Sequence, residues 1–149
     1  TLVNTGERIT AGEARWLACQ ADILPAVMGG ASVPLDVGRK KRLFTGHLRA
    51  VLVARDQGCA FPGCDRGPEE CEAHHILAWY LGGRTSLTSG VRLCPFHHHL
   101  VEPNPVWADA RNWQIRLNAA GLPEFGAPVG LGALPGQRRW RQHHRYVTA

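Results

Sequence analysis

The sequence lacks long apolar runs, and it contains no segment with targeting character. No run approaches the roughly 18 apolar residues of a membrane-spanning helix, so we expect no membrane span. The chain does not open on the apolar core of a signal peptide, so secretion is unsupported and a cytoplasmic location is expected. It begins with Thr1 rather than Met, and we therefore expect a fragment of a longer protein.

The cysteine content is equally informative, because five cysteines cannot all pair within one chain. Together with eight histidines, they favour a metal site in a reducing compartment over a disulfide framework. The apolar fraction of 44% is too high for an intrinsically disordered chain. The 149 residues suffice for one domain, or one and a half, with a real hydrophobic core.

Lysine is scarce, and the basic residues are almost all arginine. Fifteen Arg and two Lys exceed 12 acidic residues, which gives a net charge of +5. Arginine binds phosphate through two parallel hydrogen bonds, so this excess indicates an acidic partner. Four consecutive cations occupy positions 39–42, where phosphate contact and an ordinary solvated face are both reasonable interpretations.

Hydrophobic periodicity and turn residues predict short helices and strands. The expected elements are a helix over 10–21, a hairpin over 23–37, a helix over 45–56 and a strand over 112–117. Thr10 and Glu13 have the spacing of a capping box, and Gly58 is the expected C-cap of the second helix. Residues 121–136 resemble an extended loop. The basic tail 138–146 is either a nucleic-acid contact or a frayed end.

Four residues have the spacing of a structural zinc site. Cys59 and Cys64 flank a Pro-Gly turn that lets both sulfurs face one ion. Thirty residues later, Cys94 and His97 form a second pair, at the mouth of a predicted helix. The Cys₃His set fills all four positions of a tetrahedral zinc ion, so it activates no water. Cys71 is left over, as a buried thiol or as a substitute ligand.

The remaining histidines predict a second, catalytic metal. His74 and His75 are adjacent on a predicted strand over 71–78, so their side chains point to opposite faces. We therefore do not expect both to chelate one ion, and two roles are implied. His74 and His98 as metal ligands, with His75 beside them as a base, account for all three residues.

The part of the chain that carries these cysteines and histidines resembles a known family, the HNH endonucleases. The matching segments are CAFPGC, CEAHHILAW and GGRTSLTSGVRLCPFHH, all between residues 59 and 98. Similarity to actinobacterial HNH proteins, which carry a large helical domain of unknown function before the nuclease, extends over about residues 1–120. The resemblance implies an α+β fold with a small ββα-metal finger and a structural zinc knuckle, preceded by helix–hairpin–helix elements. The expected division is 1–57, 58–105 and 106–149.

Carried over by position, His75 matches the general base of the family and His98 its metal-binding histidine. His74 stands where most members have an aspartate ligand, although bacteriocin nucleases of this class also use His-His. Ser89 occupies the position of the Asn that braces the loop and helps to orient the base. A hydroxyl is expected to replace one hydrogen bond of that amide, but not both.

The resemblance implies a metal-dependent endonuclease with one divalent metal beside the structural Zn²⁺, and the expected substrate is double-stranded DNA. Among Mg²⁺, Mn²⁺, Ni²⁺ and Co²⁺, the imidazole-rich site is expected to accept the last three at least as well as Mg²⁺. The predicted DNA contacts are Arg39, Lys40, Lys41, Arg42, Arg84 and Arg92. Two alternatives remain: a zinc-stapled nucleic-acid-binding module without cleavage, and a purely structural zinc domain. The sequence does not reveal the oligomeric state.

Overall fold

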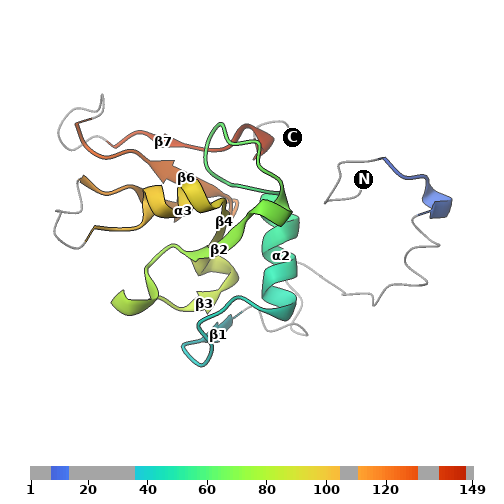
Figure 1. Ribbon diagram of the computed structural model, residues 1–149, viewed down its shortest axis with the longest axis horizontal. Helices are drawn as coiled ribbons and strands as arrows, with labels where there is room; N and C mark the ends of the chain where they lie inside the picture. Colours follow the sequence, from blue (N-terminus) through green and yellow to red (C-terminus); the bar gives the residue numbers. More distant parts are fainter. Residues whose placement is uncertain (1–7, 14–35, 105–110, 131–137, 147–149) are drawn as a thin grey trace.

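Two antiparallel strands and the helix that follows them lie at the centre of the computed structural model (Figure 1). β2 (Glu72–His75) pairs with β4 (Gly90–Leu93), and all four residues of β4 are buried. α3 (Pro95–Val101) begins directly after β4, with Cys94 at its N-cap. Its first residue is a proline, which is favourable because this position needs no N–H for the helix.

The structure describes residues 8–13, 36–104, 111–130 and 138–146. These ranges form a small α+β protein of short elements, in agreement with the predicted class. Single 3₁₀ turns cover Pro68–Glu70, Trp79–Leu81, Leu87–Ser89 and His144–Tyr146. Among the helices in the described ranges, none is long and apolar enough to cross a membrane.

α2 (Gly46–Asp56) packs against β4 through one apolar face. Leu48 and Leu52 are one helical turn apart and form a small core with Phe44. Gly90 permits this close approach, because a Cβ at that position would lie 2.5 Å from the Phe44 ring. The C-cap is Gln57, in a left-handed conformation (φ 52°), whereas we expected Gly58 to cap this helix.

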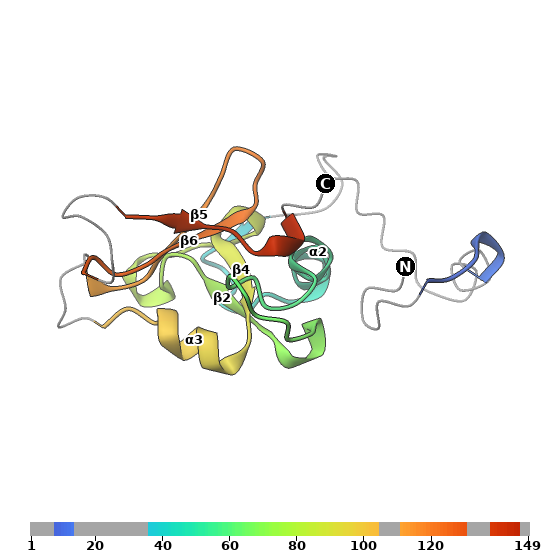
Figure 2. The same cartoon turned by 90° about the horizontal axis from the view of Figure 1, so that it is seen from above.

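A second core surrounds three cysteines. Its buried members are Cys59, Ala60, Cys64, Cys71, Val91, Leu93, Cys94, Val101 and Phe125. Phe125 comes from a separate three-stranded antiparallel sheet of β5 (Gln114–Leu117), β6 (Pro123–Gly126) and β7 (Trp140–Arg141). Figure 2 has this sheet above the β2–β4 pair and α3 below it. The C-terminal sheet therefore completes the core around the cysteines.

The remaining strand pair is formed by β1 (Asp36–Gly38) and β3 (Thr85–Ser86). This pairing brings the basic residues 39–42 next to the loop between β2 and β3. A contact across almost 50 residues fixes it further, because Arg84 forms an ion pair with Asp36 at 2.8 Å. The pairing explains how a charged segment that precedes α2 comes to lie near the β2 histidines.

Several expected elements differ from the structure. β6 lies within the segment expected to be a loop, 121–136, because its pairing with β5 and β7 supplies hydrogen bonds that local sequence does not reveal. The strand expected over 112–117 begins at Gln114. The Thr10–Glu13 capping box is confirmed by reciprocal hydrogen bonds of 2.8 and 3.2 Å. The rest of the helix over 10–21, and the hairpin up to residue 35, lie outside the described residues.

Asp56, at the end of α2, joins three distant parts of the chain. Its buried carboxylate accepts hydrogen bonds from the Arg55 guanidinium at 2.7 Å and from the Arg92 backbone N–H at 2.8 Å. The Tyr146 hydroxyl donates a third, at 3.2 Å. The tail over 138–146 is therefore packed onto α2 rather than frayed.

Replacing Asp56 by alanine leaves the buried Arg55 cation without its carboxylate partner, although two backbone carbonyls still accept from it, and leaves the Tyr146 hydroxyl without this acceptor. Loss of one partner from a buried pair costs about 3–5 kcal/mol, and we expect a loss of this size for Asp56→Ala. Urea denaturation followed by circular dichroism measures it. Glu70→Ala is the matched control, because Glu70 pairs with Arg66 on the surface, where such pairs contribute about 1 kcal/mol or less. Equal losses in the two variants contradict the role of Asp56.

Candidate metal centres

Three thiols and one imidazole converge at the base of α3. The Sγ atoms of Cys59, Cys64 and Cys94 and a ring nitrogen of His97 all lie within 4.8 Å of one another. His97 Nδ1 is 3.2 Å from Cys94 Sγ and 3.5 Å from Cys59 Sγ. With Zn–S bonds of about 2.3 Å, tetrahedral ligand atoms lie about 4 Å apart, so this cluster fits a structural zinc ion.

Local backbone geometry positions these ligands. Cys59 and Cys64 follow α2 in a tight turn, in which the Cys64 N–H donates to the Phe61 carbonyl at 3.2 Å. Gly63 within this turn has a positive φ of 78°, which a residue with a side chain rarely adopts. Cys94 and His97 lie three residues apart at the start of α3 and so share one helix face.

Burial makes the cluster unfavourable for charged thiols unless a cation is present. Burial raises the pKa of Cys64 to about 11, so without a metal this thiol is protonated at neutral pH. A zinc ion reverses this preference, because it binds the thiolate form. The four cysteines in the described ranges are all free and buried, so none of them is held in a disulfide.

The surroundings of the cluster hold it rigidly. The Phe61 ring stacks on His97 with 4.0 Å between centroids. From the tail, His143 hydrogen-bonds the Cys64 carbonyl at 2.7 Å, and Arg145 donates to the same oxygen at 3.0 Å. Cys71 is buried next to the cluster, but its thiol donates to the Gly67 carbonyl at 3.1 Å. It lies outside the four-ligand group.

The β2 histidines face different neighbours, as strand alternation predicts. The ring of His74 is buried and lies 4.7 Å from the ring of His98 on α3. The ring of His75 packs against Phe44 at 4.6 Å and Trp79 at 5.5 Å. Both residues nevertheless line one cavity of about 300 Å³, at the end of β2.

A second possible metal centre lies in that cavity and includes a residue that our sequence reasoning missed. His74, His98 and Glu102 bring their ligand atoms within 4.8 Å of one another. Glu102 follows His98 by four residues, so α3 presents both on one side, and this spacing could have been read from the sequence. Burial and the neighbouring His98 lower the pKa of His74 to about 3, which keeps its lone pair available.

Hydrogen bonds fix the tautomer of His75. The hydroxyl of Thr85 has a single proton, which it donates to the Arg42 carbonyl at 3.1 Å. His75 Nε2, 3.0 Å from that hydroxyl oxygen, must therefore carry a proton and donate it. Nδ1 is left with its lone pair. Burial, and then the Arg42 cation, lower the pKa of His75, so the ring is neutral at pH 7.

Ser89 braces the loop before β4 through hydrogen bonds to backbone groups. Its hydroxyl accepts from the Ser86 N–H at 3.1 Å and also donates to the Arg84 carbonyl. Its backbone carbonyl accepts from the Ile76 N–H at 2.8 Å, directly after His75. A single serine therefore both donates and accepts here, which is more than we expected from the sequence.

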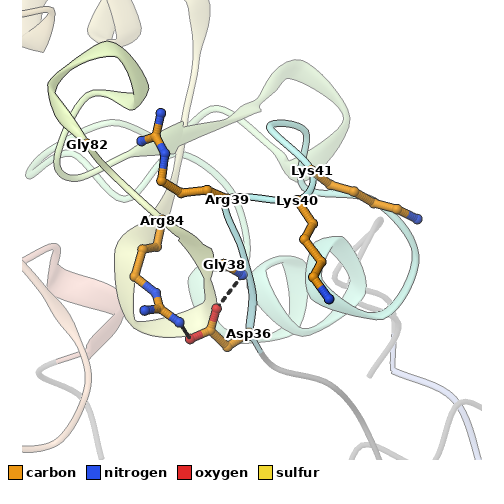
Figure 3. Close-up of a pocket in the computed structure, with 7 residues that line it drawn as sticks. All are labelled: Asp36, Gly38, Arg39, Lys40, Lys41, Gly82 and Arg84. Atoms are coloured by element: carbon orange, nitrogen blue, oxygen red, sulfur yellow. Dashed lines mark hydrogen bonds and ion pairs between the residues drawn. The ribbon is translucent and has the colours of Figure 1, made fainter.

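Most of the predicted DNA contacts surround a separate cavity of about 900 Å³ (Figure 3). Its lining residues are Asp36, Gly38, Arg39, Lys40, Lys41, Gly82 and Arg84. In Figure 3, Arg39 extends toward the loop that carries Gly82, whereas the two lysines extend in other directions. Arg39 donates to the Trp79 and Gly83 carbonyls, and its guanidinium lies 4.4 Å from the Trp79 ring.

Two other predicted contacts lie elsewhere. Arg42 lines the cavity of the β2 histidines. Arg92 is only 1% exposed, and its guanidinium donates to the carbonyls of Pro68 and Cys71. Because β4 is buried along its whole length, Arg92 is not available to a DNA phosphate, and that expectation is corrected.

Similarity to known proteins supports homology but names no function. The chain is 32% identical over 94% of its length to the uncharacterized proteins Rv1945 and Rv1148c of Mycobacterium tuberculosis. It is 35% identical over 61% of its length to the uncharacterized protein Rv1128c of the same organism. The chain spans about 30% of the length of the first two relatives and 18% of the third. No family model matches the sequence. No solved structure matches it either.

Zinc content distinguishes the ligand cysteines from Cys71. We expect the purified chain to hold one zinc ion, which Cys64→Ser loses together with its fold, because a buried Cys₃His site depends on all its ligands. Cys71→Ser is the matched control, and it is expected to retain one zinc. Elemental analysis and circular dichroism measure the two effects. A folded Cys64→Ser protein without zinc contradicts the structural role of the site.

Proposed function

We propose that this chain is a metal-dependent endonuclease domain of the HNH type that hydrolyses DNA phosphodiester bonds. One observation carries the proposal. A single cavity contains a possible metal site of His74, His98 and Glu102 and, beside it, a neutral His75 with a free Nδ1 lone pair. A Lewis acid and a base placed together are what phosphodiester hydrolysis requires.

The order of elements supports the same proposal. The chain runs from β2 through a loop to β4 and then α3. The cluster of Cys59, Cys64, Cys94 and His97 lies at the base of these elements. A ββα-metal finger has this order, with its base histidine at the end of the first strand and a metal ligand on the helix. His75 ends β2 and His98 lies on α3. The structural cluster and the proposed catalytic residues thus share one small scaffold.

In the proposed reaction, each residue has a distinct part. His74, His98 and Glu102 would hold a divalent cation, which supplies charge stabilisation at the phosphate and leaving oxygens. His75 Nδ1 accepts a proton from the attacking water, while Thr85 holds its Nε2–H in place. Arg42 adds positive charge at the cavity wall. Two imidazoles and one carboxylate favour Mn²⁺, Ni²⁺ or Co²⁺ at least as much as Mg²⁺.

The basic cavity supports nucleic acid as the substrate. Arg39, Lys40, Lys41 and Arg84 line it, and only one of the seven lining residues is acidic. The loop that carries Trp79 and Gly82 separates it from the cavity of the histidines, because Trp79 lines one cavity and Gly82 the other. Phosphates along a DNA strand could therefore be bound on one side of this loop while one phosphate reaches the proposed metal.

Plasmid nicking tests the proposal. We expect the chain to convert supercoiled plasmid to nicked or linear forms with Mn²⁺, Ni²⁺ or Co²⁺, and EDTA to stop the reaction. His75→Ala should lose at least about 100-fold in rate, because a general base contributes about 10²–10⁴-fold. His47→Ala is the matched control, since His47 is an exposed histidine on α2.

Absence of cleavage by the wild type, combined with salt-sensitive DNA binding, would support the alternative of a binding module without activity. Cleavage with Mg²⁺ alone would argue against His74 as a ligand.

Thr85 provides a finer test of the base. Thr85→Val keeps the shape of the side chain but removes the hydroxyl that orients His75, so we expect kcat to fall at least about tenfold with little change in KM. Thr85→Ser restores the hydroxyl and should recover most of the rate. Thermal unfolding monitors stability in both variants. A valine variant with the kcat of the wild type contradicts this role.

A further inference from the structure

A third cavity, of about 460 Å³, lies between the loop after β2 and the C-terminal sheet. Its lining includes Leu77, Leu81, Trp113, Gln114, Arg116 and Trp140. Apolar and aromatic residues dominate this lining, and a few polar groups interrupt them. Cavities of this size and composition are typical binding sites for small organic groups.

Contacts with neighbouring side chains hold its two tryptophans in place. Trp113 packs edge-on against Phe61 with 5.0 Å between centroids, and Phe61 stacks on the zinc-type ligand His97. The guanidinium of Arg116 lies 4.0 Å from the Trp140 ring and is fixed by an ion pair with Glu124 at 2.7 Å. Rigid aromatic walls reduce the entropy cost of binding a planar group.

The cavity also has polar capacity. Asn112 uses its side-chain amide on the backbone of Asn104, at 3.1 and 3.3 Å. Among the described residues, the side chain of Gln114 has no hydrogen-bond partner, so its amide can both donate and accept. A heteroaromatic group with a hydrogen-bonding edge matches this lining better than a purely apolar one.

The cavity adjoins the proposed catalytic site. His74 and Ala78 line both this cavity and the cavity that contains His75, His98 and Glu102. Leu81 also lines the aromatic cavity, and the next residue in the same loop, Gly82, lines the basic cavity. One loop, Leu77–Gly82, is thus bordered by a cationic cavity, a possible metal site and an aromatic cavity.

We propose that the aromatic cavity receives an unstacked nucleobase of the nucleotide next to the phosphate held at His74 and His98. The inference rests on the proposed nuclease function and specifies its substrate as DNA with unpaired nucleotides at the cleavage site. A base inside an intact duplex is stacked and paired, and its extraction has an energetic cost that an unpaired base largely avoids. Stacking on aromatic side chains accepts any base, so the cavity selects strand structure rather than sequence.

The neighbouring charges favour a nucleotide over other occupants. An apolar small molecule or an apolar protein side chain would fit between the tryptophans, but it carries no negative charge to pair with the cations on the other side of the loop. A nucleotide uses both, because its base needs apolar walls and its phosphates need cations such as Lys40 and Lys41.

The test measures base unstacking without cleavage. The full chain with His75→Ala is titrated onto matched oligonucleotides, fully paired or with a short single-stranded gap, that carry 2-aminopurine at one gap position. Because this analogue changes its fluorescence when its stacking partners change, we expect a saturable signal for gapped DNA. Affinity for gapped DNA should be at least fivefold higher than for the paired duplex.

Two variants locate the effect. Trp140→Ala and Leu81→Ala should each weaken binding to the gapped DNA, by about fivefold or more for the tryptophan, and leave duplex binding within twofold. Leu100→Ala is the matched control, because Leu100 is also an exposed leucine but lines none of these three cavities. If Trp140→Ala fails to fold, Leu81→Ala still decides the question, since Leu81 is 57% exposed.

Equal affinity for gapped and paired DNA, or no effect of either cavity variant, overturns the inference. Failure of the nuclease proposal gives a different result, because the wild type then cleaves neither DNA while the fluorescence response persists. If paired and gapped DNA are cleaved at the same rate and no fluorescence response is seen, the nuclease function is supported and the proposal that the cavity binds a base is refuted.

Discussion

The burial of three thiols around His97 is the interaction on which the rest of the structure depends. Without a cation these groups form a polar cluster inside a small core, and with one they become a crosslink between the loop after α2 and the start of α3. The same crosslink sets the direction of α3 and hence the position of His98. Phe61 extends its influence to Trp113 through stacked and edge-on rings. One ion would thus fix the positions of His98 and Trp113 without contacting either.

The sequence was most informative where function depends on local spacing. Cys59 and Cys64 lie in one turn, and Cys94 and His97 lie at one helix start, so the two ligands of each pair face the same way because of local chain geometry. The opposite orientation of His74 and His75 follows from strand alternation. Both predictions needed no knowledge of which segments pack together.

Long-range packing decided what the sequence could not. Arg92 has the same side chain as the exposed arginines, but the burial of β4 turns it inward. β6 depends on partners on either side of it, so its composition alone indicated a loop. Glu102 could have been predicted as a ligand from its helical spacing to His98. The hydrogen bond between Thr85 and His75 could not, because it depends on the β1–β3 pairing that places Thr85.

The contacts of the tail have a consequence for synthesis of the chain. Arg145 and Tyr146 bind Asp56 across about 90 residues, and His143 reaches back to the Cys64 carbonyl. During synthesis, Cys59, Cys64, Cys94 and His97 therefore emerge from the ribosome well before residues 143–146. Residues 143–146 can therefore close over Asp56 and the Cys64 carbonyl only after the cluster residues have been free to bind a metal ion.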